Sequence, residues 1–207
     1  MMKIENKPYN SNYFDKAVDL LKETWDFTLH FKNLKDLDVP YNYYLQEVLI
    51  NCSYCRILVD EKDQVLGFIF AEMHEKSNKW KLFKLNAKIL ISTLLGDFGK
   101  RSDAFSFFWQ YSRDCKALYK GSRFDNEVYL LAVSQKAKGK GLGKKLINNY
   151  LKECRNNKIS KIGLQTASDC NYNFYDYMGF ERESSMYTDM YEPGKEDENF
   201  FIYTMKA

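Results

Sequence analysis

The sequence predicts a single α/β domain, because runs with the period of a β-strand alternate along it with runs of helical spacing. Residues 55–59 and 64–71 are two apolar runs separated by the polar turn 60–63, which is typical of an antiparallel hairpin. Residues 142–154 repeat apolar side chains every four positions, as one face of a helix does. A chain of 207 residues that is 45% hydrophobic and 29% charged can build one domain with a sizeable core.

The elements before the hairpin follow from local signals. Residues 1–10 are expected to contain a first strand. A helix is predicted over 14–25, with Asn12 as its N-cap, and a second helix over 41–51, opened by Pro40.

Residues 75–125 are expected to form two helices rather than strands. The first ends before Gly96, and the second begins at a cap on Ser102 and stops at Gly121. Each helix carries an apolar stripe that must be buried against something. Two interpretations remain open: a helical hairpin packed on the flank of the domain, or a lid over a ligand site or a dimer contact.

The most informative segment is a strand, a glycine-rich turn and a helix in direct succession. The strand Val128–Val133 leads into Gly139, Gly141 and Gly143, which permit positive φ and close approach of a ligand. The first N–H groups of the following helix have no partner within it and favour an anion. We therefore expect a phosphate-bearing ligand here. Lysines crowd the same segment: Lys136, Lys138, Lys140, Lys144 and Lys145.

Two common phosphate-binding motifs do not fit this turn. In a nucleoside-triphosphate P-loop the glycine spacing would be one residue longer, and a hydroxyl would stand where this chain has Lys145. In a dinucleotide fingerprint the third glycine would come later than Gly143.

A third motif fits. The segment Lys136-Ala-Lys-Gly-Lys-Gly141 resembles the pyrophosphate turn Gln/Arg-x-x-Gly-x-Gly/Ala of the Gcn5-related N-acetyltransferases (GNAT), with Lys136 replacing the family's Gln or Arg. A second block, Phe174-Tyr-Asp-Tyr-Met-Gly-Phe180, is similar to the family's Phe-Tyr-x-x-x-Gly-Phe segment. Between the blocks, residues 159–166 alternate as a strand. The family's order of elements is thus met from 127 to about 188.

This resemblance implies a fold and an activity. The fold would be one domain, 1–207, with a mixed, mostly antiparallel central sheet flanked by helices and a helical insertion at 75–125 between the third and fourth strands. The activity would be transfer of an acetyl group from acetyl-CoA to a primary amine by direct attack in a ternary complex. The acceptor is expected to be a small molecule. The alternatives are an amine of a protein or peptide, and a non-catalytic sensor or scaffold that binds acetyl-CoA.

The resemblance also implies the residues that bind the coenzyme. The amide of Leu131 would polarise the thioester carbonyl, and Val133 would bond the pantetheine arm through its backbone. Asn171 is preferred for a pantetheine contact, because Ser168 stands where the family usually has Asn. The expected cofactor-binding residues are Leu131, Ala132, Val133, Lys138, Gly139, Lys140, Gly141, Leu142, Gly143, Lys144 and Asn171.

Three residues are expected to catalyse the reaction: Tyr175, Glu127 and the amide of Leu131. Tyr175 matches the family tyrosine that protonates the departing thiolate. The alternative is a core aromatic, although a tyrosine with a buried ring still needs a partner for its hydroxyl, which the thiolate could be. Deprotonating an alkylamine at neutral pH costs roughly 4–5 kcal/mol, so a general base is useful. Glu127 is the predicted base, with Glu72 in reserve. Glu127 could equally be a polar residue at the start of a strand.

The acceptor side is less defined. The family binds acceptors with loops that correspond to 27–31 and 191–198 in this chain. The second loop contains four acidic residues that could attract an ammonium group, or could simply be solvated: Glu192, Glu196, Asp197 and Glu198. Sixteen tyrosines and fifteen phenylalanines make an aromatic-lined pocket easy to build.

Composition narrows the remaining classes. A net charge of +3 is too small to suggest nucleic acid as a partner. We expect no membrane partner, because no run of 18 apolar residues occurs. We expect no metal, because the chain has two histidines and only one Cys-x-x-Cys pair, at 52–55. The N-terminus lacks the apolar core of a signal peptide, so a cytoplasmic protein with reduced thiols is expected. A homodimer is left open.

Overall fold

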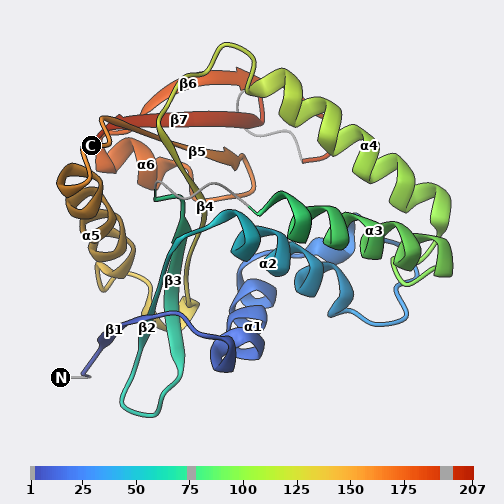
Figure 1. Ribbon diagram of the computed structural model, residues 1–207, viewed down its shortest axis with the longest axis horizontal. Helices are drawn as coiled ribbons and strands as arrows, with labels where there is room; N and C mark the ends of the chain where they lie inside the picture. Colours follow the sequence, from blue (N-terminus) through green and yellow to red (C-terminus); the bar gives the residue numbers. More distant parts are fainter. Residues whose placement is uncertain (1–2, 74–77, 192–197) are drawn as a thin grey trace. The chain divides into compact units, whose positions relative to one another are not determined.

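The computed structural model describes residues 3–73, 78–191 and 198–207. The helices in these ranges are α1 (Phe14–Thr24), α2 (Val39–Asn51), α3 (Lys79–Leu95), α4 (Arg101–Leu118), α5 (Leu142–Asn156) and α6 (Asn173–Met178). The strands are β1 (Glu5–Pro8), β2 (Tyr54–Val59), β3 (Val65–Ala71), β4 (Asn126–Val133), β5 (Lys161–Ala167), β6 (Glu181–Met186) and β7 (Phe200–Lys206). The predicted mixed α/β class is confirmed (Figure 1).

The strands hydrogen-bond in the order β1-β2-β3-β4-β5-β7-β6. The pairs β1–β2, β2–β3, β5–β7 and β6–β7 are antiparallel, whereas β4–β5 is parallel. The predicted mostly antiparallel sheet is therefore confirmed. The chain divides into two compact units, which share β4: unit 1 holds residues 1–104 and 129–150, and unit 2 holds residues 105–128 and 151–207.

Unit 1 is built around the predicted hairpin. Asp60 to Asp63 turns the chain, with Asp63 in the left-handed region at φ 58°, and β2 and β3 follow in antiparallel register. The inward side chains of β3, among them Phe68 and Phe70, are fully buried, and their rings stack with centroids 4.8 Å apart. Helices α1 and α2 pack against β3, which buries the apolar face that their helical periodicity predicts.

Unit 2 is built around β7, which lies between β5 and β6. Four consecutive side chains of β7, from Phe200 to Tyr203, are almost completely buried. Leu118, at the end of α4, packs into this core together with Phe200 and Ile202. The C-terminal half of α4 is thus part of the core of unit 2.

The helices of the predicted insertion are present, and two of the predicted caps are wrong. α3 ends at Gly96, which has φ 80° as the sequence indicated. α4 begins at Arg101, so Ser102 lies inside the helix and bonds to Asp103 instead of capping it. Asn12 does not cap α1, because a 3-10 turn precedes that helix and Asn10 caps that turn.

Gly163 of β5 generates a prediction about stability. A Cβ built on Gly163 would lie 2.4–2.6 Å from ring atoms of Phe124, so the ring occupies the space that a side chain would need. We expect Gly163→Ala to lower the free energy of unfolding by roughly 1–3 kcal/mol through overpacking. Urea denaturation followed by circular dichroism measures it. Glu181→Ala on the outer strand β6 is the control, and equal stability of the two variants would contradict the packing argument.

Candidate active site

The glycine-rich turn has the backbone that its sequence predicts. Ser134 ends β4, a 3-10 turn covers Gln135–Ala137, and α5 starts at Leu142. Gly139 has φ 75° and Gly141 has φ 70°, both in the left-handed region that favours glycine. A Cβ built on either glycine would meet nothing within 4 Å, so the concave side of the turn is open.

Several amides of this turn have no acceptor in the part of the chain that the structure describes. Lys138 and Lys140 donate to Gln135 and Ala137 and so close the turn. The regular hydrogen bonds of α5, each to the carbonyl four residues earlier, begin with the Lys145 amide, which donates to the carbonyl of Gly141. No described residue accepts from the amides of Gly139, Gly141, Leu142 and Gly143. These donors can receive an anionic oxygen at the start of the helix.

Glu23 of α1 anchors the start of the turn, and the sequence analysis missed it. Its carboxylate accepts hydrogen bonds from the Ser134 hydroxyl at 3.0 and 3.1 Å and from the Gln135 amide at 2.5 Å. Ser134 is buried, and its Oγ also accepts from the Lys136 amide at 3.3 Å. The two partners lie more than a hundred residues apart in the sequence. No local pattern could have revealed the pairing.

The amides of Leu131 and Val133 lie on one edge of β4. The Ser134 amide donates to the carbonyl of Leu66 in β3, whereas the Asp125 amide donates to the carbonyl of Lys161 in β5. Alternation along a strand therefore directs the amides at 131 and 133 away from β3. The described β4–β5 ladder covers only residues 126–128 paired with 162–164, so it does not reach these amides. The amides of Leu131 and Val133 are therefore outside the β4–β5 ladder, and an amide must be free of such pairing if it is to polarise a ligand carbonyl.

Tyr175 lies in α6, and aromatic neighbours fix its ring. The centroids of Phe180 and Tyr203 are 5.7 and 5.9 Å away. The side chain is half-buried, and burial raises the pKa of the Tyr175 hydroxyl above its ordinary value. None of the described residues forms a hydrogen bond with that hydroxyl. The phenol therefore stays protonated at neutral pH and has a proton to donate.

The structure defines few contacts for Asn171 and for the second acceptor loop. Asn171 is exposed, and its carbonyl accepts from Phe174 at the start of α6. Most of the acidic loop at 191–198 lies outside the described residues, including three of its four acidic side chains. The expectation that this loop attracts an ammonium group stays a prediction.

Glu127 is held by a tyrosine from the end of the insertion. Its carboxylate is buried, with 9% of the residue exposed, and Oε1 accepts a hydrogen bond from the Tyr119 hydroxyl. In register, Glu127 lies opposite Gly163, and the Phe124 ring fills the space above that glycine. The rings of Tyr119 and Phe124 are 6.2 Å apart. The predicted base is thus a fixed, buried carboxylate rather than a solvated residue at the end of a strand.

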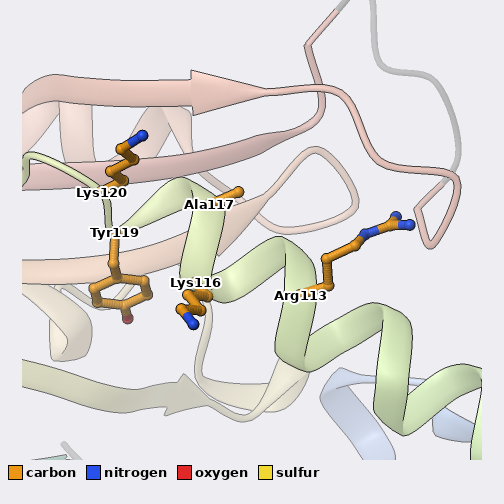
Figure 2. A pocket seen from close by; sticks show the side chains of 5 residues that line it. All are labelled: Arg113, Lys116, Ala117, Tyr119 and Lys120. Atoms are coloured by element: carbon orange, nitrogen blue, oxygen red, sulfur yellow. The ribbon is translucent and has the colours of Figure 1, made fainter.

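Tyr119 also lines a hollow of about 610 Å³ at the C-terminal end of α4. Figure 2 shows its lining side chains, which are Arg113, Lys116, Ala117, Tyr119 and Lys120. The Lys116 side chain points to the same side as the Tyr119 ring, whereas Lys120 and Arg113 point elsewhere (Figure 2). Arg113 is paired with Asp114 at 2.8 Å. The cations do not converge, so this hollow is not built to hold an anion.

Glu72, the reserve base, is held in unit 1 by two other tyrosines. Its Oε1 accepts from the Tyr129 hydroxyl at 3.2 Å, and its carbonyl accepts from the Tyr150 hydroxyl at 2.7 Å. Tyr150 is fully buried. Both candidate carboxylates therefore have defined positions, Glu72 in unit 1 and Glu127 in unit 2.

The first acceptor loop carries an ordered aromatic cluster. Phe27 stacks on Tyr41 with ring centroids 4.7 Å apart and meets Tyr44 edge-on at 5.1 Å. The Tyr41 hydroxyl accepts from the Phe27 amide and donates to the Trp25 carbonyl. These rings pack against the core of unit 1, where Tyr41 is buried, and the aromatic-lined acceptor pocket stays a prediction.

Comparison with known proteins gives one family match and a set of solved structures with a similar fold. The family described as acetyltransferase (GNAT) domain matches residues 106–190, from within α4 to just after β6. Among curated protein sequences nothing matches.

Solved structures share the fold over almost the whole chain. Arylalkylamine N-acetyltransferase 2 from Aedes aegypti is 16% identical and aligns over 99% of both chains with a TM-score of 0.63. The C-terminal condensation domain of Ebony, solved with β-alanyl-dopamine, is 11% identical over 100% of both chains, with a TM-score of 0.60. The NatC complex bound to Gag peptide and CoA is 19% identical over 100% of this chain and 99% of that one, with a TM-score of 0.53. At these identities the similarity establishes the fold.

The seven-stranded mixed sheet, with a glycine-rich turn between β4 and α5, defines an acetyltransferase-type fold. The match to the acetyltransferase (GNAT) domain over residues 106–190 includes β4, the glycine-rich turn and β5, and it supports this fold for that part of the chain.

The anchoring contact of Glu23 generates a prediction. Glu23→Ala removes the acceptor for Ser134 and Gln135, so the turn is less well ordered before a ligand binds. We expect the dissociation constant for coenzyme A to rise about tenfold. Asp19→Ala, an equal loss of charge on the same helix, is the control. Calorimetric titration measures both variants, and unchanged affinity in Glu23→Ala would contradict the anchoring role.

Proposed function

We propose that this chain transfers an acetyl group from acetyl-CoA to a primary amine of a small molecule, by direct attack while both substrates are bound. The observation that carries the proposal is the open turn before α5: the amides of Gly139, Gly141, Leu142 and Gly143 have no acceptor among the described residues, and Gly139 and Gly141 have positive φ, which suits a diphosphate. The lysines around the turn add long-range attraction for the same anion.

The residues present fit this coenzyme. Gly139 and Gly141 leave empty the space that a Cβ would fill, so a phosphate can approach the backbone closely. The amide of Val133 is available to a pantetheine arm along the edge of β4. The amide of Leu131 would donate to the thioester oxygen as negative charge develops there. Asn171 is proposed as a further pantetheine contact.

Glu127 is proposed as the general base. A primary amine is almost fully protonated at neutral pH, so its proton must leave before the nitrogen can attack. The hydrogen bond from Tyr119 holds the carboxylate in one orientation. Glu72 remains the reserve candidate, because Tyr129 holds its carboxylate in a comparable way.

Tyr175 is proposed as the general acid that protonates the departing thiolate. Its hydroxyl has no hydrogen-bond partner among the described residues, and its raised pKa keeps the proton in place through neutral pH. Because burial raises the pKa of Tyr175, its hydroxyl stays protonated to a higher pH than that of an ordinary tyrosine. Activity should therefore not fall on the alkaline side through ionisation of Tyr175 near its ordinary pKa of about 10.

A primary arylalkylamine is the favoured acceptor class. The partly exposed rings of Phe27 and Tyr44 offer apolar surface and cation–π attraction for an ammonium group, and the buried Tyr41 ring stacks on Phe27. Two of the structural neighbours are named with an arylalkylamine or its conjugate: one is an arylalkylamine N-acetyltransferase, and the other was solved with β-alanyl-dopamine. An amine of a peptide is the second candidate, because the NatC neighbour was solved with a peptide.

Calorimetry with coenzyme A and chromatographic detection of released coenzyme test the proposal. The folded protein should bind coenzyme A saturably and release it from acetyl-CoA when an arylalkylamine is added. A panel of arylalkylamines, polyamines and peptides with free N-termini separates the acceptor classes. Absence of coenzyme uptake would overturn the proposal. Uptake without turnover on any amine would favour the sensor or scaffold alternative.

Tyr175→Phe tests the acid. We expect turnover to fall at least tenfold while the affinity for coenzyme A stays near normal, because only the proton donor is lost. Tyr177→Phe, on the same short helix and 73% exposed, is the matched control and should leave turnover unchanged. Steady-state kinetics together with calorimetry decide the matter, and full turnover in Tyr175→Phe would reject the role.

Glu127→Gln tests the base. The amide keeps an acceptor for Tyr119 but cannot take a proton. The activity ratio of wild type to variant should grow as the pH is lowered from about 8 to 6, because free amine becomes rarer. Glu181→Gln, the same change of charge on β6, is the control. A loss of equal size at every pH would instead indicate a structural role for Glu127.

A further inference from the structure

Helix α3 packs beside α2 (Figure 1). Its inner face is buried through Leu85, Ser92 and Thr93, and the Ser92 hydroxyl lies 2.8 Å from that of Tyr43 on α2. The opposite face is exposed, although a surface helix normally shows polar residues there. Its large apolar side chains, each 50–64% exposed, are Trp80, Phe83, Leu90, Ile91, Leu94 and Leu95.

The exposed side chains form a continuous stripe rather than scattered points. Positions 80, 83, 87, 90 and 94 follow one another at intervals of three and four, which places them on one helix face. The row runs from residue 80 to residue 94, which is 14 helical rises or roughly 21 Å. We call Trp80, Phe83, Ala87, Leu90 and Leu94 the α3 stripe. A patch of this extent on a soluble domain marks an interaction surface.

The charge of α3 has a single sign. The helix contains Lys79, Lys81, Lys84 and Lys88, all exposed, and no aspartate or glutamate. The Lys84 ammonium lies 5.2 Å from the centroid of the Trp80 ring, which itself stacks on Phe83 at 5.6 Å. Cations therefore border the aromatic end of the stripe, and their long stems can keep the charge level with a polar surface while the stripe is buried.

We propose that the α3 stripe docks onto the surface of a membrane rich in anionic lipids. Tryptophan, phenylalanine and leucine on one face, bordered by lysines, are the features of a helix that lies flat in the headgroup region. A second copy of the chain fits less well, because it would bring four more lysines and no acidic residue from α3 to pair with them.

This inference departs from the expectation of no membrane partner. That expectation rested on the lack of an apolar run long enough to span a bilayer, and among the described residues no helix is long and apolar enough to do so. A helix that lies in the interface needs only one apolar face and a cationic border, and α3 has both.

Vesicle flotation with the full chain tests the proposal. The wild type should float with phosphatidylcholine vesicles that contain about 30% phosphatidylserine, and at least tenfold less with phosphatidylcholine alone. Leu90→Ser/Leu94→Ser should lower partitioning more than tenfold by removing apolar contact. Lys84→Gln/Lys88→Gln should lower it roughly 30-fold on the anionic vesicles, at about 1 kcal/mol for each lysine.

Matched variants control for exposure and charge. Leu37→Ser removes a leucine that is 59% exposed on a loop, and Lys62→Gln/Lys152→Gln removes two exposed lysines outside α3. Both should float like the wild type. Failure of the wild type to float, or equal loss in the controls, would overturn the proposal. Dimerisation in sedimentation velocity that Leu90→Ser/Leu94→Ser abolishes, without flotation, would overturn it in favour of a second copy.

Discussion

The backbone amides at the start of α5 are the constraint on which the proposed chemistry depends. Gly139 and Gly141 take positive φ, and no described residue accepts from the amides that point out of this turn. Unpaired N–H groups at a helix start favour an anion, and the helix dipole adds to the attraction. Glu23 fixes the preceding residues from a different helix, so the donors are arranged before any ligand arrives. Binding then costs less ordering of the chain.

The two candidate bases follow a common arrangement. Glu127 and Glu72 each accept a hydrogen bond from a tyrosine hydroxyl, from Tyr119 and Tyr129 respectively. A carboxylate in this setting is held in one orientation. Tyr119 directly follows α4, so a segment that looks like an inserted flank supplies a contact to the proposed base.

The two helices of the insertion serve different purposes. The C-terminal end of α4 belongs to the hydrophobic core of unit 2, because Leu118 packs with Phe200 and Ile202. α3 buries its inner face on α2 and leaves a second apolar face in solvent. Packing thus accounts for the C-terminal end of α4 and for the inner face of α3. The outer face of α3 requires a separate explanation, and its uniform positive charge limits the choice of partner.

The sequence by itself determined the elements and the turn, because strand alternation, helical spacing and glycine placement are local properties. It placed the hairpin at 55–71, the strand before residue 134 and the open turn that follows it. Only the tertiary structure decided the long-range contacts: Glu23 on Ser134, Tyr119 on Glu127, and the burial of one face of α3. The residues in these contacts are far apart in the sequence, or are of a type that occurs many times in the chain. Composition and spacing therefore cannot tell which residue meets which. The predicted caps at Asn12 and Ser102 were wrong because the exact starts of α1 and α4 differ from those that the local sequence suggested.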